Sequence, residues 1–156
     1  QMDIEGAEYR NILHCPEETL RRFRIIILEV HSLQLLSRLS FLRGVFRPFM
    51  DKIVSDFTCV HAHANNCCGV VNIESGFEVP RVLELTFLRK DRIGEDNIPV
   101  QIPNPLDIVN VQDKPPIYLG KPWNNGTQSL ESRLLMVEQK TRWLESKMSE
   151  NDIGEK

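Results

Sequence analysis

The chain has 156 residues, of which 41% are hydrophobic and 26% are charged, and its formal net charge at pH 7 is −3. This size and composition suit one globular domain with a single hydrophobic core. The slight negative charge, and the lack of a basic patch with interleaved aromatic residues, argue against nucleic acid as a partner. No apolar run in the sequence approaches the length of a membrane span, so we expect no membrane segment.

The first residues carry neither the basic nor the apolar segment of a signal peptide, and the chain does not begin with methionine. We therefore expect the sequence to come from the middle of a longer protein. The four cysteines contain no C-x-x-C pair, and the adjacent Cys67 and Cys68 are not expected to bond to each other. Free thiols favour a reducing compartment, so the cytoplasm is the preferred location, although the sequence does not specify it.

The amino-terminal third predicts two short helices followed by a strand. Residues 2–5 resemble the end of a strand that turns at Gly6 into a helix over 7–13, and Pro16 begins a second helix. Arg24–His31 is the clearest strand, because its successive apolar residues are mostly β-branched. Such an unbroken apolar run predicts burial on both faces of a parallel sheet.

The middle of the chain predicts a broken helix and two further strands. Residues 33–57 have helical periodicity, with a break near Gly44 and a second helix that has Pro48 in its first turn. A strand then leads into His61, Ala62 and His63, which places both imidazoles on one face. Residues 65–80 are expected to form a turn-rich loop, and 82–89 an antiparallel neighbour of the histidine strand.

The amino-acid composition changes after residue 90, which predicts that the later residues are separate from the domain. Residues 1–90 are expected to form the domain, and the proline-rich residues 91–126 an extended segment packed on it. Residues 127–156 predict a charged helix, in which apolar positions over 130–148 repeat at intervals of four and three. That spacing is typical of a coiled coil and predicts a homodimer, whereas the alternative is an amphipathic helix packed on its own domain.

Four stretches of the chain together resemble the carboxyl-terminal half of the FkbM-type methyltransferases. The resemblance runs from Met2 to about Trp123, and one departure is Ala64, where many members have glycine. The matching stretches are Asp3-Ile4-Glu5-Gly6-Ala7-Glu8, Ile27-Leu28-Glu29-Val30-His31, His61-Ala62-His63-Ala64-Asn65-Asn66 and Leu83-Glu84-Leu85-Thr86-Phe87-Leu88-Arg89, followed by Pro105-Leu106-Asp107 and Asn110.

This resemblance implies an α/β fold with part of a Rossmann-like class I methyltransferase sheet. The chain would supply the end of strand four, all of strand five and the antiparallel strands six and seven, with strand seven inserted between five and six. The resemblance also implies S-adenosylmethionine as cofactor. The sequence contains no G-x-G turn to cradle it, so the cofactor-binding half is expected upstream.

The polar residues at the predicted strand ends are the candidate site. In open α/β sheets the cleft lies at the carboxyl ends of the strands. Methyl transfer to a hydroxyl needs a base, and histidine titrates near neutral pH. We expect His31 or His63 to be that base, oriented by Asp3 or Glu29. The residues expected to hold the acceptor, a small molecule or a glycan, are Glu5, His61, Asn65 and Asn66.

Other functions stay open from the residues alone. Asp3, Glu29, His31 and His63 form a nitrogen and oxygen set that could suit a divalent metal ion, although the favoured chemistry uses none. His-x-His at a strand end also occurs in metal-dependent barrel hydrolases, but that fold needs about 250 residues. The remaining alternative is a non-catalytic interaction module that dimerises through its last helix.

Overall fold

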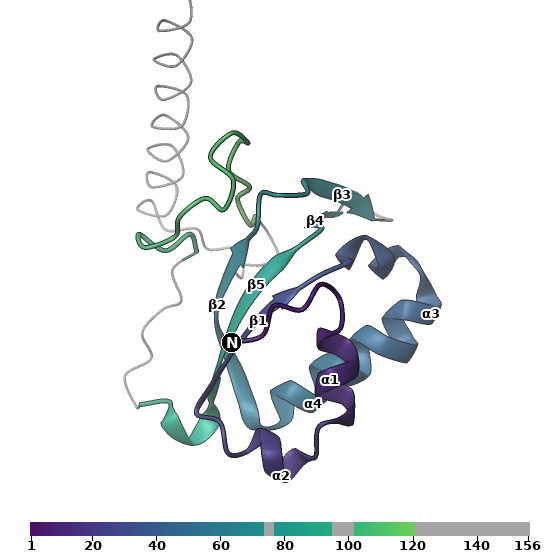
Figure 1. The fold of residues 1–156 in the computed structure, drawn as a ribbon, viewed down its shortest axis with the longest axis vertical. Helices are drawn as coiled ribbons and strands as arrows, with labels where there is room; N and C mark the ends of the chain where they lie inside the picture. Colours follow the sequence, from purple (N-terminus) through teal and green to yellow (C-terminus); the bar gives the residue numbers. More distant parts are fainter. Residues whose placement is uncertain (74–76, 95–101, 121–156) are drawn as a thin grey trace, which may run out of the picture.

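The computed structural model describes residues 1–73, 77–94 and 102–120. These residues form a mixed α/β arrangement around a three-stranded antiparallel sheet with the order β1-β5-β2 (Figure 1). The strands are β1 (Ile25–Val30), β2 (Phe57–Ala64) and β5 (Leu83–Arg89). The helix predicted at 127–156, and the dimer contact over 130–148, lie outside the described residues.

Strand β5 lies between β1 and β2 and pairs antiparallel with both. The antiparallel pairing of the histidine strand with 82–89 is therefore confirmed, as is the insertion of the last strand between the other two. Met2 forms a parallel bridge with Leu28 on the outer edge of β1, where Met2 N–H donates to Ile27 O at 2.9 Å. Because β1 and β2 both oppose β5, they run parallel, and their carboxyl ends meet at one edge of the sheet.

One expectation about β1 is wrong. The apolar run predicts burial on both faces, but Ile25 and Ile27 are 53% and 38% exposed. The alternate residues Ile26, Leu28 and Val30 are buried. Strand β1 thus has one core face and one open face, because within the described residues the helices pack on one side of the sheet only.

The helices gather on one side of the sheet (Figure 1). They are α1 (Glu8–His14), α2 (Glu17–Leu20), α3 (Leu39–Phe41) and α4 (Arg47–Asp56). A 3₁₀ turn spans Leu33–Ser37, and a π-helical turn spans Leu42–Phe46. The expected break near Gly44 is therefore a widened turn, and Pro48 lies in the first turn of α4 as predicted.

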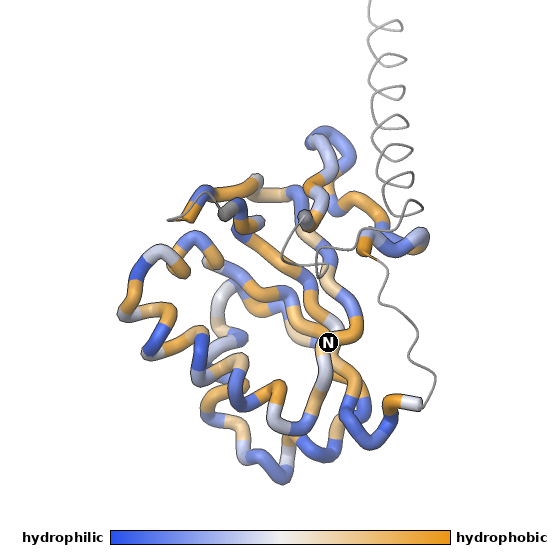
Figure 2. The backbone as a smooth tube through the Cα atoms, turned by 180° about the vertical axis from the view of Figure 1, so that it is seen from behind, coloured by the Kyte–Doolittle hydropathy of each residue, from blue (hydrophilic) through white to orange (hydrophobic). Residues whose placement is uncertain are grey.

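The core forms where the helices meet the sheet. Tyr9 on α1 packs edge-on against Phe49 on α4, with ring centroids 4.9 Å apart. Figure 2 shows hydrophobic residues concentrated in the strands, while the helices alternate between hydrophobic and hydrophilic positions. The buried side chains include Ile12, Leu28, Val30, Phe49, Ile53, Phe57, Ala62, Leu83, Leu85 and Phe87.

The stretch expected to be a turn-rich loop contains a β-hairpin. Strands β3 (Val70–Ile73) and β4 (Phe77–Pro80) pair antiparallel, from Val70 opposite Pro80 to Ile73 opposite Phe77. Strands of four residues carry too little periodicity to be separated from a loop in the sequence. A 3₁₀ turn at Lys90–Arg92 follows β5.

Residues 102–120 pack on the domain as an extended segment. Ile102 and Leu119 are buried against it, and Asp107 contacts His61. These residues therefore contact the domain, while the proline-rich segment with its bounds at 91 and 126 stays a prediction. Among the described residues, no helix combines the length and the apolar character needed to cross a membrane.

Candidate functional site

A single imidazole at the end of β1 is surrounded by carboxylates. The His31 cluster consists of this ring and of Asp3, Glu5, Glu8 and Glu29. Nδ1 of His31 lies 3.0 Å from Glu8 Oε1. On the other side of the ring, Nε2 lies 3.5 Å from Glu5, and 3.9 Å from both Asp3 and Glu29.

Local backbone geometry brings the first residues of the chain to this ring. Glu5 and Gly6 both have positive φ, at 57° and 96°, and this left-handed turn redirects the chain from the bridge at Met2 into α1. Glu8 then lies in the first turn of α1, fully buried, and its Oε1 also accepts the Ile4 N–H at 2.9 Å. The Tyr9 hydroxyl donates to His31 O at 2.6 Å, which fixes the end of β1 against α1.

The His31 cluster borders a polar cavity of about 320 Å³. Asn65 Nδ2 donates to Glu29 Oε1 at 2.5 Å, so Oε2 is the oxygen that faces His31. Partial burial raises the pKa of Glu29, and the nearby charge of Asp3 adds to this, while the bond from Asn65 opposes it. The cavity is lined by Gln1, Asp3, Ile27, Leu28, Glu29, Asn65, Glu84 and Asn110.

A second cluster joins β2 to the extended segment. The Asp107 cluster consists of Asp107, His61 and His63: His61 Nε2 lies 2.9 Å from Oδ1, and His63 Nδ1 lies 3.6 Å from Oδ2. Asn104 N–H also donates to Oδ2, at 2.8 Å. Burial alone would raise the pKa of Asp107, but the bond with His61 and the proximity of His63 outweigh it and hold that pKa well below its usual range.

His63 is next to Glu84, one of the residues that line the polar cavity. It lies opposite Glu84 in the β2–β5 pair, and Glu84 accepts a hydrogen bond from Asn110 Nδ2 at 2.5 Å. Burial would lower the pKa of His63, but the contact with Asp107 and the charges of Asp107 and Glu84 outweigh it and raise that pKa. Its Nε2 atom is buried and has no hydrogen-bond partner among the described residues.

The structure separates residues that the sequence analysis grouped. Asp3, Glu5, Glu29 and His31 lie together in the structure, and Asn65 contacts them through Glu29. His63 lies with Asp107 and not with the His31 cluster, so it is no part of the set of potential metal ligands, which consists of Asp3, Glu29 and His31 among the described residues.

Asn66, which is expected to help hold the acceptor, contacts the extended segment in the structure. Its Nδ2 donates to the carbonyls of Val111 and Lys114 at 2.8 and 2.9 Å, and its Oδ1 accepts the Val111 N–H at 2.8 Å. Asn66 thereby holds the extended segment against the end of β2.

Sequence reasoning gave no role to Glu8 or to Asp107. Glu8 looked like any acidic residue in a helix's first turn, and only its complete burial marks it. Asp107 lies 46 positions from His61, in a stretch without periodicity, so its one signal in the sequence was the family resemblance.

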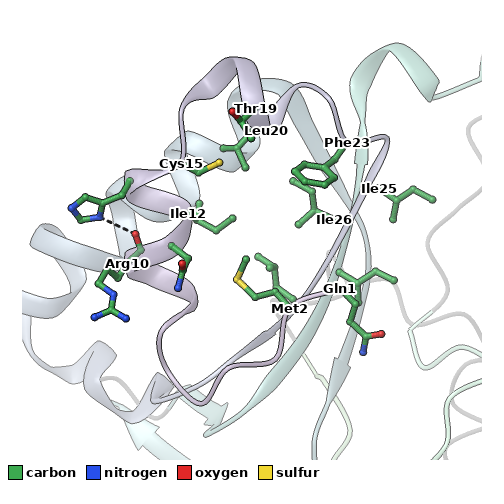
Figure 3. A pocket seen from close by; sticks show the side chains of 14 residues that line it. Gln1, Met2, Arg10, Ile12, Cys15, Thr19, Leu20, Phe23, Ile25 and Ile26 are labelled. Carbon is green, nitrogen blue, oxygen red and sulfur yellow. Dashed lines mark hydrogen bonds between the residues drawn. The ribbon is translucent and has the colours of Figure 1, made fainter.

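A larger and mostly apolar cavity of about 610 Å³ lies beside the outer edge of β1. Figure 3 shows Met2 and Ile26 on the strand side of this cavity, across from Ile12 of α1 and Leu20 of α2. Phe23, at its rim, is 50% exposed. The cavity therefore offers an apolar surface rather than a chemical centre.

Known proteins give no further assignment. Comparisons with protein-family models, with curated proteins and with solved structures found no match to this chain.

Proposed function

We propose that this chain is the acceptor-side half of an S-adenosylmethionine-dependent methyltransferase that methylates a hydroxyl group. The observation that carries the proposal is the strand order β1-β5-β2, in which an antiparallel last strand lies between two parallel ones. This is the arrangement that the family resemblance implies for strands five, seven and six. The Rossmann-like character of the complete sheet is part of the same proposal.

The outer edge of β1 supports this assignment. Met2 already pairs there in parallel, as the end of a fourth strand would. Ile25 and Phe23 are half exposed next to the apolar cavity, so a further strand and helix would bury apolar surface. In this proposal, the glycine-rich turn that binds the cofactor belongs to that upstream half.

The polar cavity is the proposed acceptor site. It lies at the carboxyl ends of β1 and β2, where α/β sheets bind their ligands. Asp3, Glu29 and Asn65 present oxygen and amide groups that can hold the hydroxyls of a small molecule or glycan. The three acidic side chains that line the cavity, Asp3, Glu29 and Glu84, favour a neutral or cationic acceptor over an anionic one.

We assign proton removal to His63. Asp107 lies next to its Nδ1, and the unpartnered Nε2 is the atom that can take a proton from the acceptor. Nε2 is buried, and Asn110 and Glu84 lie near His63 and line the cavity, so the proposal includes a shift of these two side chains when the acceptor binds. His31 is less suited to this role, because its Nε2 already faces three carboxylates.

The test is calorimetric titration of S-adenosylhomocysteine into a longer polypeptide that carries the upstream half, with the 156-residue chain in a parallel experiment. We expect saturable heat from the long form only. A long form that folds and gives no heat would overturn the methyltransferase proposal. Binding by the 156-residue chain alone would contradict the proposed division into halves.

A further inference from the structure

The His31 cluster carries more negative charge than its protein partners balance. Asp3, Glu5, Glu8 and Glu29 all lie within 4 Å of one imidazole. Among the described residues, the ion pairs of these four carboxylates include neither lysine nor arginine. Glu8 is fully buried and the Glu29 side chain is 15% exposed, and carboxylates desolvated to this degree are costly unless a cation is shared between them.

The distances around Nε2 of His31 suit a bridging ion better than direct bonds. Nε2 is 3.9 Å from both Asp3 Oδ1 and Glu29 Oε2, which is too long for a hydrogen bond. With metal–ligand distances of about 2.1 Å, two atoms that bind one ion lie up to about 4.2 Å apart. The three potential ligand atoms lie within 4.8 Å of one another, so small side-chain movements would bring all three to one ion.

Buried Glu8 is the independent sign that this ring is prepared as a ligand. It is fully buried, and its Oε1 lies 3.0 Å from Nδ1 of His31, which directs the lone pair of Nε2 toward Asp3 and Glu29. Metal-binding histidines commonly donate their second ring N–H to a carboxylate in this way. Glu8 Oε2 is buried without a hydrogen-bond partner among the described residues, so His31 is the ionisable partner of this buried carboxylate.

Asn65 fixes the third ligand in the same manner. Its amide holds Glu29 Oε1 at 2.5 Å and leaves Oε2 free on the side of His31. The Asn65 Oδ1 atom in turn accepts the Cys67 N–H at 2.8 Å, so the amide cannot rotate without losing a bond. Both the imidazole and the Glu29 carboxylate are thus oriented by a second side chain.

We propose that Asp3, Glu29 and His31 bind one divalent first-row transition-metal ion. The imidazole nitrogen favours this class over Mg²⁺ and Ca²⁺, whereas the carboxylates suit Mn²⁺ among its members. Glu5, which is largely exposed and 3.5 Å from Nε2, leaves the outer side open to water or to an acceptor oxygen. The inference does not depend on methyl transfer, because metal binding is measured without a cofactor.

The first test is titration of Mn²⁺ into the 156-residue chain, followed by electron paramagnetic resonance and calorimetry, with Mg²⁺ as comparison. We expect one Mn²⁺ per chain, bound more tightly than Mg²⁺, with spin-echo modulation from a directly bound ¹⁴N. A folded chain that binds no Mn²⁺ at millimolar concentration would overturn the proposal, as would binding without ¹⁴N coupling.

Variants that keep side-chain size separate metal binding from folding. Glu8→Gln retains an oxygen for His31, and we expect it to weaken binding about 10- to 100-fold. Glu29→Gln retains the acceptor for Asn65, and we expect at least as large a loss, while His31→Gln should also abolish the ¹⁴N coupling. His14→Gln is the matched control, because His14 is exposed at the end of α1 and bonds only Arg10 O among the described residues.

The outcomes are read together with circular dichroism of each variant. Unchanged Mn²⁺ affinity in folded Glu29→Gln and His31→Gln would contradict the assignment, and so would an equal loss in His14→Gln. If the 156-residue chain binds Mn²⁺ but the longer form does not bind S-adenosylhomocysteine, the metal-site inference is supported and the proposed methyltransferase function is contradicted.

Discussion

The His31 cluster and the Asp107 cluster use the same residue types with opposite charge balance. In the first, one imidazole faces four carboxylates, and in the second, two imidazoles share one carboxylate. Both lie at the carboxyl ends of β1 and β2, with Glu84 of β5 between Glu29 and His63. The Asp107 cluster therefore pairs its carboxylate with neighbouring imidazoles, whereas the His31 cluster groups four carboxylates around one imidazole, which is the basis of the proposed metal site.

We expect the largest loss of folding stability from a substitution that removes the Asp107 carboxylate from the Asp107 cluster. Asp107→Asn removes the charge shared by His61 and His63, and we expect it to lower the free energy of unfolding at pH 7 by about 2 kcal/mol. Because the folded pKa of Asp107 lies below the usual 3.8, its contribution is fully present above about pH 4 and is lost as the pH falls further. Urea unfolding of both proteins at pH 7 and near pH 2.5 tests this, and an equal difference at the two pH values would contradict it.

The same variant should change the titration of His63. The pKa of this ring is raised mainly by Asp107 against the opposing effect of burial, so Asp107→Asn should bring it down. In the parent chain, the stability from this ring is full below pH 6.5 and is lost as the pH rises through the raised pKa. Nuclear magnetic resonance of the imidazole carbons measures both values, and an unchanged His63 titration would show that Asp107 is not the cause.

Neutralising a carboxylate of the His31 cluster should raise the folding stability, whereas Asp107→Asn should lower it. The pKa of Glu29 is raised, so its ionised form is disfavoured in the fold, and stability is lost as the pH rises above the usual 4.5. Without metal at pH 7, we expect Glu29→Gln to stabilise the chain by on the order of 0.5 kcal/mol. Urea unfolding in the presence of a chelator tests this. If Glu29→Gln destabilised the chain as much as Asp107→Asn does, the proposed difference in charge balance between the two clusters would be contradicted.

The smallest expected effect concerns the exposed member of the same cluster. Glu5→Gln removes a surface charge near Asp3 and Glu29, and we expect a change of at most a few tenths of a kcal/mol, reduced further by salt. Gln keeps the side-chain length, so a loss of 1 kcal/mol or more would mean that Glu5 makes a structural contact rather than a repulsive one. Thermal unfolding at low and high salt distinguishes these cases.

The sequence by itself determined the local elements. The apolar run of β1, the alternation of His61 and His63, and the position of Pro48 in α4 all follow from periodicity and backbone restriction, which act over a few residues. The insertion of β5 between β1 and β2 followed from the resemblance. The hairpin of β3 and β4 did not, because strands of four residues leave no distinct pattern.

Only the tertiary structure decided which carboxylate meets which imidazole. Glu8 reaches His31 from 23 positions away, and Asp107 reaches His61 from 46. Neither pairing leaves a local signal, because each depends on how a helix or an extended segment packs against the sheet. The same packing left Ile25 exposed, buried Glu8 completely, and thereby turned a row of polar strand ends into two clusters with different charge.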